Sequence, residues 1–156
     1  MDQIQKFFQA AIAVGVIPAG TPLGEAYALG ATKADQDHLA DLVRTGVKTA
    51  TSSGFALYAK DNAPLPVAGA FDIILDGSGA PVALVYTDRV EVRSFAAVPA
   101  AHAFKEGEGD RTLAHWRKVH QAFFTQEYQA AGLTFDPAAS LVVLESFHVL
   151  YPPAAH

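Results

Sequence analysis

The sequence predicts a single α+β domain, built as a small mixed β-barrel surrounded by helices. Its 156 residues are one ordinary domain's worth, and an apolar fraction of 51% supplies enough side chains for a hydrophobic core. Segments with helical and strand periodicity follow one another in the order helix, strand, helix, strands, helix, strand. With no internal repeat or linker, this order favours helices packed around one mixed sheet.

The chain is expected to begin with an amphipathic helix. Within residues 2–17, apolar side chains recur at intervals of three and four residues, and Gly15 and Pro18 would end the helix. We therefore assign residues 1–20 to an N-terminal helical extension and residues 21–156 to the main domain.

A lysine and a row of hydroxyls follow the second predicted helix. After a possible short strand at 25–30, the helical pattern begins near Asp35 and ends at Arg44, with Gly46 where a left-handed terminating residue belongs. The segment 46–53, Gly-Val-Lys-Thr-Ala-Thr-Ser-Ser, comes next and is here called the lysine patch.

The second half of the chain predicts a hairpin, an acidic turn, a long helix and a final strand. Two strands, 70–75 and 80–92, are joined by Asp-Gly-Ser-Gly. A short helix at 102–105 precedes the acidic turn 106–111, Glu-Gly-Glu-Gly-Asp-Arg. The longest helical stripe then starts at Leu113, and alternating residues 141–150 form the last strand.

Charge and residue usage exclude several classes of function. Eleven basic against sixteen acidic residues, a net charge of −5, argue against a general duplex-binding surface. There is no cysteine, none of the six histidines forms a zinc pair at i, i+4, and no nucleotide-binding glycine motif occurs. We expect no metal, no cofactor, no membrane span, no obligate protein partner and a cytoplasmic location.

Lys48 and Thr51 are candidates for nucleophilic chemistry. A partly desolvated lysine can take the proton of a threonine hydroxyl that attacks a substrate, provided that a turn or bulge brings the two together. From the residues alone the structural alternative is favoured, in which Lys48 caps the carbonyls of the preceding helix and the hydroxyls occupy one face of a strand.

Several motifs together resemble the ASCH domain, in its longer bacterial branch. They are the Gly-x-Lys-x-x-Thr of the lysine patch, Gly69 before the hairpin, the acidic turn, and the Trp-Arg-x-x-His that starts at Trp116. The resemblance runs from about Gly24 to Tyr151, nearly the whole chain. It implies a PUA-like β-barrel and a role in RNA or nucleoside metabolism.

The resemblance also implies catalytic residues. Some compact ASCH proteins look like amidohydrolases that remove the acyl group from 4-N-acetylcytidine with a lysine, a threonine and a glutamate. By motif position these correspond to Lys48, Thr51 and either Glu106 or Glu108, with Glu106 favoured by counting from His102. The structural alternative for the acidic turn is a solvated loop that caps the long helix.

We expect the substrate to meet five further residues, namely Ser53, Tyr58, Glu108, Arg111 and Arg117. The expected ligand is a modified ribonucleoside or single-stranded RNA. Arg117 is a candidate for a phosphate or for nearby carboxylates, whereas Trp116 is assigned to the core. Two alternatives stay open: a ribonuclease in which Thr51 only donates a hydrogen bond and Tyr58 assists, and a non-catalytic RNA-binding module.

Overall fold

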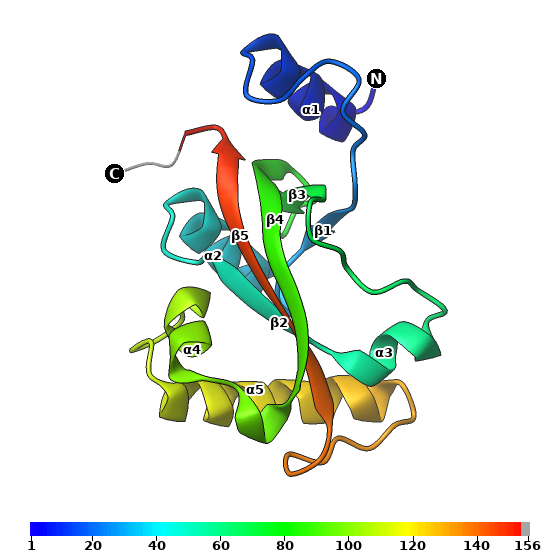
Figure 1. Ribbon diagram of the computed structural model, residues 1–156, viewed down its shortest axis with the longest axis vertical. Coiled ribbons are helices and arrows are strands. Elements are labelled where there is room, and N and C mark those ends of the chain that lie inside the picture. Colours follow the sequence, from blue (N-terminus) through cyan, green and yellow to red (C-terminus); the bar gives the residue numbers. More distant parts are fainter. Residues whose placement is uncertain (154–156) are drawn as a thin grey trace. The chain divides into compact units, whose positions relative to one another are not determined.

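The computed structural model describes residues 1–153 (Figure 1). The described helices are α1 (Gln3–Ala13), α2 (Lys33–Arg44), α3 (Phe55–Lys60), the short 3-10 helix η1 (Phe95–Ala97), α4 (Ala100–Glu106) and α5 (Leu113–Ala130). The strands are β1 (Ala26–Ala28), β2 (Ala50–Gly54), β3 (Phe71–Leu75), β4 (Pro81–Ser94) and β5 (Leu141–Tyr151). Of the described elements, only α3 and η1 were not expected from the sequence.

The five strands form one mixed sheet in the order β1-β3-β4-β5-β2. Strand β1 runs parallel to β3, while the pairs β3–β4 and β2–β5 are antiparallel. The predicted α+β class is confirmed. The sheet is open, with β1 and β2 at its two edges, where the sequence had suggested a barrel.

The chain divides into two compact units. The first contains residues 1–49, 68–88 and the C-terminal segment from 147, and the second contains residues 50–67 and 89–146. The strands β4 and β5 pass from one unit into the other. No helix in the described part of the chain combines the length and apolar character needed to cross a membrane.

In the first unit, the hairpin β3–β4 is covered on both faces. Side chains alternate along a strand, so the register partners Ile73 and Leu84 share one face and cluster with Phe8 and Ala11 of α1. The next pair, Ile74 and Ala83, clusters with buried side chains of α2. A capping box of Asp2 and Gln5 starts α1. The N-terminal helix therefore packs on this unit's own strands.

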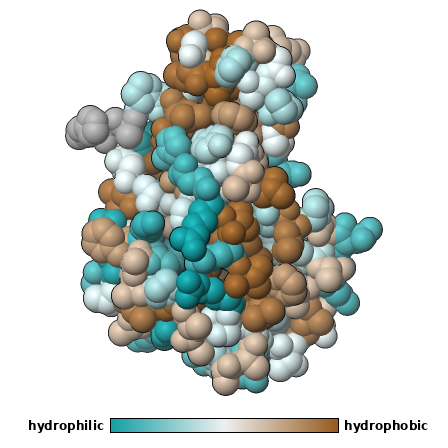
Figure 2. All heavy atoms as spheres, viewed as in Figure 1, coloured by the Kyte–Doolittle hydropathy of each residue, from teal (hydrophilic) through white to brown (hydrophobic). Residues whose placement is uncertain are grey.

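Apolar residues also remain at the surface near the N-terminus. On the face shown in Figure 2, apolar residues gather over the segment that holds α1. Val14 and Val16, directly after this helix, are among the large exposed apolar residues of the chain.

A buried carboxylate in the first unit makes its stability depend on pH. Asp72 in β3 is only 6% exposed, and its Oδ1 accepts a hydrogen bond from the Glu25 backbone N–H at 2.8 Å. Burial raises the pKa of Asp72; the Glu25 N–H opposes this effect and the Glu25 carboxylate adds to it. The folded protein thus binds this proton more tightly than the unfolded chain.

We expect Asp72→Asn to be more resistant to urea than the wild type at pH 7, since asparagine keeps an acceptor oxygen and removes the charge. The wild type loses stability as the pH rises from about 3.9, the ordinary value for aspartate, through the raised pKa of the folded state. The difference between the two proteins should therefore shrink at pH 3.5. Urea unfolding at both pH values tests this, and a difference that does not change with pH would contradict it.

The second unit is built around one aromatic core. Its buried members include Phe95, Trp116, Phe124 and Tyr128, which come from η1 and one face of α5. Helices α4 and α5 both lie against β2. Gly54 at the end of β2 is required there, because a Cβ atom at this position would collide with the ring of Tyr128.

Candidate functional site

Glu106 is a buried carboxylate at the end of α4, in the second unit. The residue is only 1% exposed, and Gly107 follows it in the left-handed conformation with φ 75°. The chain thus turns directly after the carboxylate, at a position where glycine is favoured. A buried carboxylate is costly unless hydrogen-bond donors surround it.

Three side chains supply donors to the Oε2 atom of Glu106. The Trp116 indole Nε1–H donates at 2.6 Å, the Ser52 hydroxyl donates through a short hydrogen bond, and His102 Nε2 lies at 3.0 Å. An ionised carboxylate oxygen accepts only, so His102 donates to it in the tautomer that carries the proton on Nε2. The same nitrogen lies 2.8 Å from Ser52 Oγ. The carboxylate is therefore fixed in orientation by residues from β2, α4 and α5.

His120 faces the other oxygen of this carboxylate. Its ring stacks on the Trp116 indole, one helical turn earlier, with a centroid distance of 4.3 Å. Nδ1 lies 2.9 Å from the Trp116 carbonyl oxygen and must be the donor, since a carbonyl only accepts. Nε2 is then directed at Glu106 Oε1, 3.4 Å away.

The surroundings of His120 act on its pKa in opposite directions. Burial, the largest influence, disfavours the charged ring. Three neighbours together outweigh burial: the Glu106 carboxylate through its contact and its negative charge, the charge of Glu108, and the Trp116 carbonyl. The pKa of His120 is therefore raised above its usual value.

The hydroxyls of β2 are divided between two faces of the strand. Alternation places Ser52 on the face of Glu106, and places Thr51 and Ser53 on the opposite face. Thr51 is paired across the sheet with Glu145 of β5, and both are buried. Directly paired residues bring their side chains close together. Ser52 therefore contacts Glu106, whereas the carboxylate beside Thr51 is that of Glu145.

Ser53 and Tyr58, two of the residues predicted to meet the substrate, lie close to each other in the structure. Their hydroxyl oxygens are 2.6 Å apart. Burial raises the pKa of the Tyr58 phenol, the hydrogen bond with Ser53 lowers it, and the charge of Glu145 raises it further. Thr51, Ser53, Tyr58 and Glu145 therefore form a second polar group on the other face of β2.

Lys48 belongs to the first unit, in the segment between α2 and β2. The residue is only 1% exposed, so its ammonium group is taken out of bulk water. Its backbone N–H donates to the Leu42 carbonyl at 3.0 Å, just after Gly46 adopts φ 80°. The carbonyl at the helix end is thus capped by the backbone N–H of Lys48.

The two candidate arginines differ in their contacts. Arg111 has φ 64°, lies over the Phe104 ring at 3.8 Å from the centroid, and donates to the Phe104 carbonyl. Arg117 was expected to pair with carboxylates or substrate, but it donates to three backbone carbonyls around η1, those of Phe95, Ala96 and Val98. Its observed contacts are structural, because this turn presents three carbonyl oxygens to one guanidinium.

The expected cap of the long helix is confirmed. Thr112 is the N-cap of α5, and its hydroxyl oxygen accepts from the His115 backbone N–H at 3.2 Å. Asp110 in turn accepts from both the N–H and the hydroxyl of Thr112. The acidic turn therefore has two roles: Asp110 organises the helix start, while Glu106 enters the buried network.

Four network residues lie outside the sequence-predicted site: Ser52, His102, Trp116 and His120. The signal for three of them was the i, i+4 spacing of His102 with Glu106 and of Trp116 with His120, which places each pair on one helix face. Glu145 was also missed, since an acidic residue in an alternating strand has no distinctive spacing.

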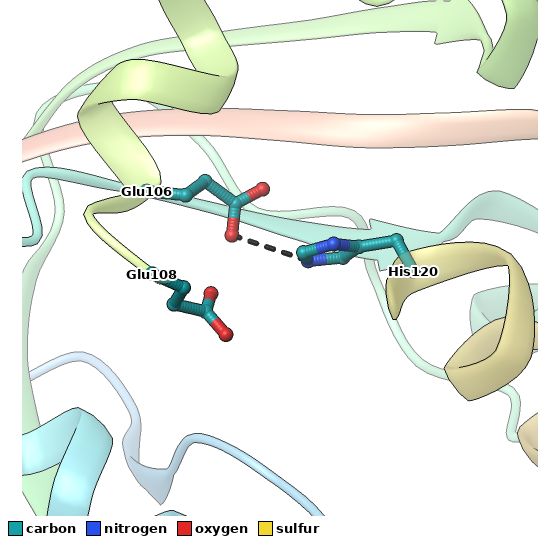
Figure 3. A group of neighbouring side chains, drawn as sticks. All are labelled: Glu106, Glu108 and His120. Atoms are coloured by element: carbon teal, nitrogen blue, oxygen red, sulfur yellow. Dashed lines mark ion pairs between the residues drawn. The ribbon is translucent and has the colours of Figure 1, made fainter. Parts of the chain in front are cut away.

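Glu106, Glu108 and His120 also form a possible metal-binding group (Figure 3). One ligand atom from each lies within 4.8 Å of the others. The sequence analysis expected no metal on the basis of histidine spacing within a helix. Such spacing cannot reveal a group assembled from the acidic turn and a separate helix.

The comparisons identify the family. The ASCH domain model matches residues 25–151, so the chain belongs to the ASCH domain family, and its fold is PUA-like. The ASCH domain from Lactobacillus crispatus JV V101 is 26% identical with a TM-score of 0.89, covering 97% of this chain and 96% of that chain. Because only 3% of this chain lies outside that match, the match includes residues of α1. No curated protein matches.

A second solved structure supports the same assignment. Protein EF3133 from Enterococcus faecalis V583 is 32% identical, with a TM-score of 0.85 over 94% of this chain and 87% of that chain. The hypothetical protein PH0355, 16% identical with a TM-score of 0.53, covers 80% of this chain and 97% of that chain and shares the fold alone.

Proposed function

We propose that this ASCH protein is a hydrolase that acts on an acylated cytidine or a related modified ribonucleoside. Lys48 is the general base, Thr51 the nucleophile and Glu106 the assisting carboxylate. The observation that supports this proposal most is the immobilised carboxylate of Glu106, buried and held by three donors. Such preorganisation is typical of catalytic groups and is costly for stability alone.

The reaction would proceed through an acyl-enzyme. Lys48, three residues before Thr51, takes the hydroxyl proton as Thr51 Oγ1 attacks the amide carbonyl carbon. The C–N bond then breaks and the cytidine amine leaves with that proton, while the negative charge of Glu106, on the other face of β2 from Thr51, stabilises by its field the positive charge that develops on the amine. Water hydrolyses the threonine ester and releases the carboxylic acid.

The buried position of Lys48 fits the role of a base. A general base must be held beside the hydroxyl that it deprotonates, and burial restricts the movement of a lysine side chain. Lys48 is 1% exposed, unlike Lys105 and Lys118 in the second unit, which are both exposed.

We expect Lys48→Met to lower kcat for 4-N-acetylcytidine about 100-fold, the usual contribution of a general base. Methionine is chosen because it fills a similar volume, which limits the damage that a cavity would cause. Lys118→Met, at an exposed position of α5, is the matched control and should leave kcat unchanged. Equal rates for the two variants would remove Lys48 from the mechanism.

A product analysis separates this function from its two alternatives. Purified protein is incubated with 4-N-acetylcytidine and, separately, with labelled single-stranded RNA, both in chelator. The proposal predicts cytidine and acetate. Shortened RNA without cytidine release would favour the ribonuclease. Binding of RNA with a steep salt dependence and no product would favour the binding module.

A further inference from the structure

We infer that Glu106, Glu108 and His120 form a binding site for one divalent first-row transition-metal ion. The three side chains come from two separate segments, the acidic turn after α4 and the middle of α5, and they point toward a common space (Figure 3). One nitrogen and two carboxylate oxygens lie within 4.8 Å of one another. The site lies wholly within the second unit.

His120 is held in the orientation that metal ligation requires. Its Nδ1–H is engaged by the Trp116 carbonyl at 2.9 Å, and stacking on the indole fixes the plane of the ring. In the neutral ring the lone pair is then on Nε2, the atom directed at Glu106. A hydrogen bond from the second ring nitrogen to a backbone carbonyl is the arrangement found around most metal-bound histidines.

The spacing of His120 and Glu106 fits an ion placed between them. Zinc lies about 2.1 Å from imidazole nitrogen and carboxylate oxygen, so two tetrahedral ligand atoms are about 3.4 Å apart. Nε2 and Oε1 are 3.4 Å apart. That distance is long for a charge-assisted hydrogen bond, which is about 2.8 Å.

Glu106 has the outer contacts expected of a ligating carboxylate. Its Oε2 accepts from Trp116, Ser52 and His102, which turns the other oxygen toward His120. Outer hydrogen bonds of this kind orient ligands before the ion arrives. Little side-chain entropy remains to be lost on binding at Glu106.

Glu108 completes the site and gives it access to solvent. It is only partly buried, so its flexible side chain can close the remaining distance to the ion. Three protein ligands leave a position for water. The imidazole favours zinc, iron or copper, and the two carboxylates also accommodate manganese, whereas magnesium and calcium prefer oxygen alone.

Ion binding would regulate the proposed reaction. That reaction uses Glu106 and requires no ion, so an ion on Glu106 would compete with its catalytic role. Zinc should then inhibit deacylation, and chelator should restore it. The metal site rests on its own geometry, and its test is binding to the substrate-free protein, so the failure of one proposal is distinguishable from the failure of the other.

Titration calorimetry with Zn²⁺ on chelator-stripped full-length protein tests the site. We expect one ion per chain, and at least a tenfold weaker affinity in Glu108→Gln and in His120→Gln. The matched controls are Glu127→Gln and His115→Gln, which change the same residue types on the same helix α5 outside the group. Both controls should bind as the wild type does, and equimolar Mg²⁺ should not displace zinc.

Co²⁺ absorption gives a second readout, because bands between about 500 and 650 nm report a site with nitrogen and oxygen ligands of low coordination number. Their loss in Glu108→Gln is expected. Circular dichroism checks folding. If His120→Gln fails to fold, the Glu108→Gln variant still tests the site, because Glu108 is partly exposed. No zinc binding by the wild type, or equal binding by Glu108→Gln and both controls, would overturn the inference.

Discussion

Thr51→Val is expected to abolish turnover of 4-N-acetylcytidine, with a loss of kcat on the order of 1,000-fold or more. Valine matches the shape of threonine but has no hydroxyl, so no acyl-threonine can form. Thr51 is only 8% exposed, so an apolar side chain of equal size should be accommodated at this position. Reversed-phase separation of cytidine from its acyl form measures the rate directly.

Ser52→Ala is the matched control for this experiment. Ser52 is the adjacent hydroxyl on the same strand, but it faces Glu106, whereas Thr51 faces Glu145. Its removal takes one donor from a positioning network, and we expect a loss of kcat of about tenfold with an unchanged chemical course. A reversal of the two effects would make Ser52 the nucleophile and would reject Thr51.

Trp116→Ala is expected to have the largest effect on stability, a loss of about 4 kcal/mol in the free energy of unfolding. Trp116 is only 3% exposed and stacks between Phe95 and His120. It also donates to Glu106 at 2.6 Å, so its removal leaves a buried carboxylate with one donor fewer. Urea unfolding is followed by far-ultraviolet circular dichroism, because Trp116 is the single tryptophan and the variant has no tryptophan fluorescence.

Trp116→Phe separates packing from hydrogen bonding. Phenylalanine keeps an aromatic ring against Phe95 but loses the N–H, so we expect a cost of about 1–3 kcal/mol. This cost should fall in the Glu106→Gln background, because the charged acceptor is already absent. Val119→Ala, on the exposed side of α5, should stay close to the wild type. A Trp116→Phe protein as stable as the wild type would show that the donor to Glu106 contributes nothing.

Local patterns in the sequence were sufficient to predict most of the fold. The spacing of apolar residues in α1, α2 and α5 predicted which helix faces are buried. The Asp-Gly-Ser-Gly turn predicted the hairpin of β3 and β4. Helix α3 was missed because its six residues are too few to show periodicity. The open sheet was missed because the sequence pattern carries no signal for whether edge strands meet.

The site was only partly predictable for the same reason. Motif resemblance selected Glu106, and in the structure this carboxylate is buried in a polar network. The alternation that separates Ser52 from Thr51 was foreseeable once a strand was assumed, but the partner of each hydroxyl was not. Glu145 reaches Thr51 through the pairing of β2 with β5, across more than ninety residues of chain. The pairing of two strands so far apart in the chain cannot be predicted from the spacing of neighbouring residues.

The most direct measurement of the central claim compares wild-type and Glu106→Gln protein for release of cytidine from 4-N-acetylcytidine in the presence of chelator. Glutamine preserves the size of the side chain and removes its charge, and circular dichroism establishes that the variant is folded. We predict cytidine and acetate in equal amounts from the wild type, and at least a 100-fold slower release from Glu106→Gln. Equal rates from the two proteins, or no cytidine from either, would contradict the account.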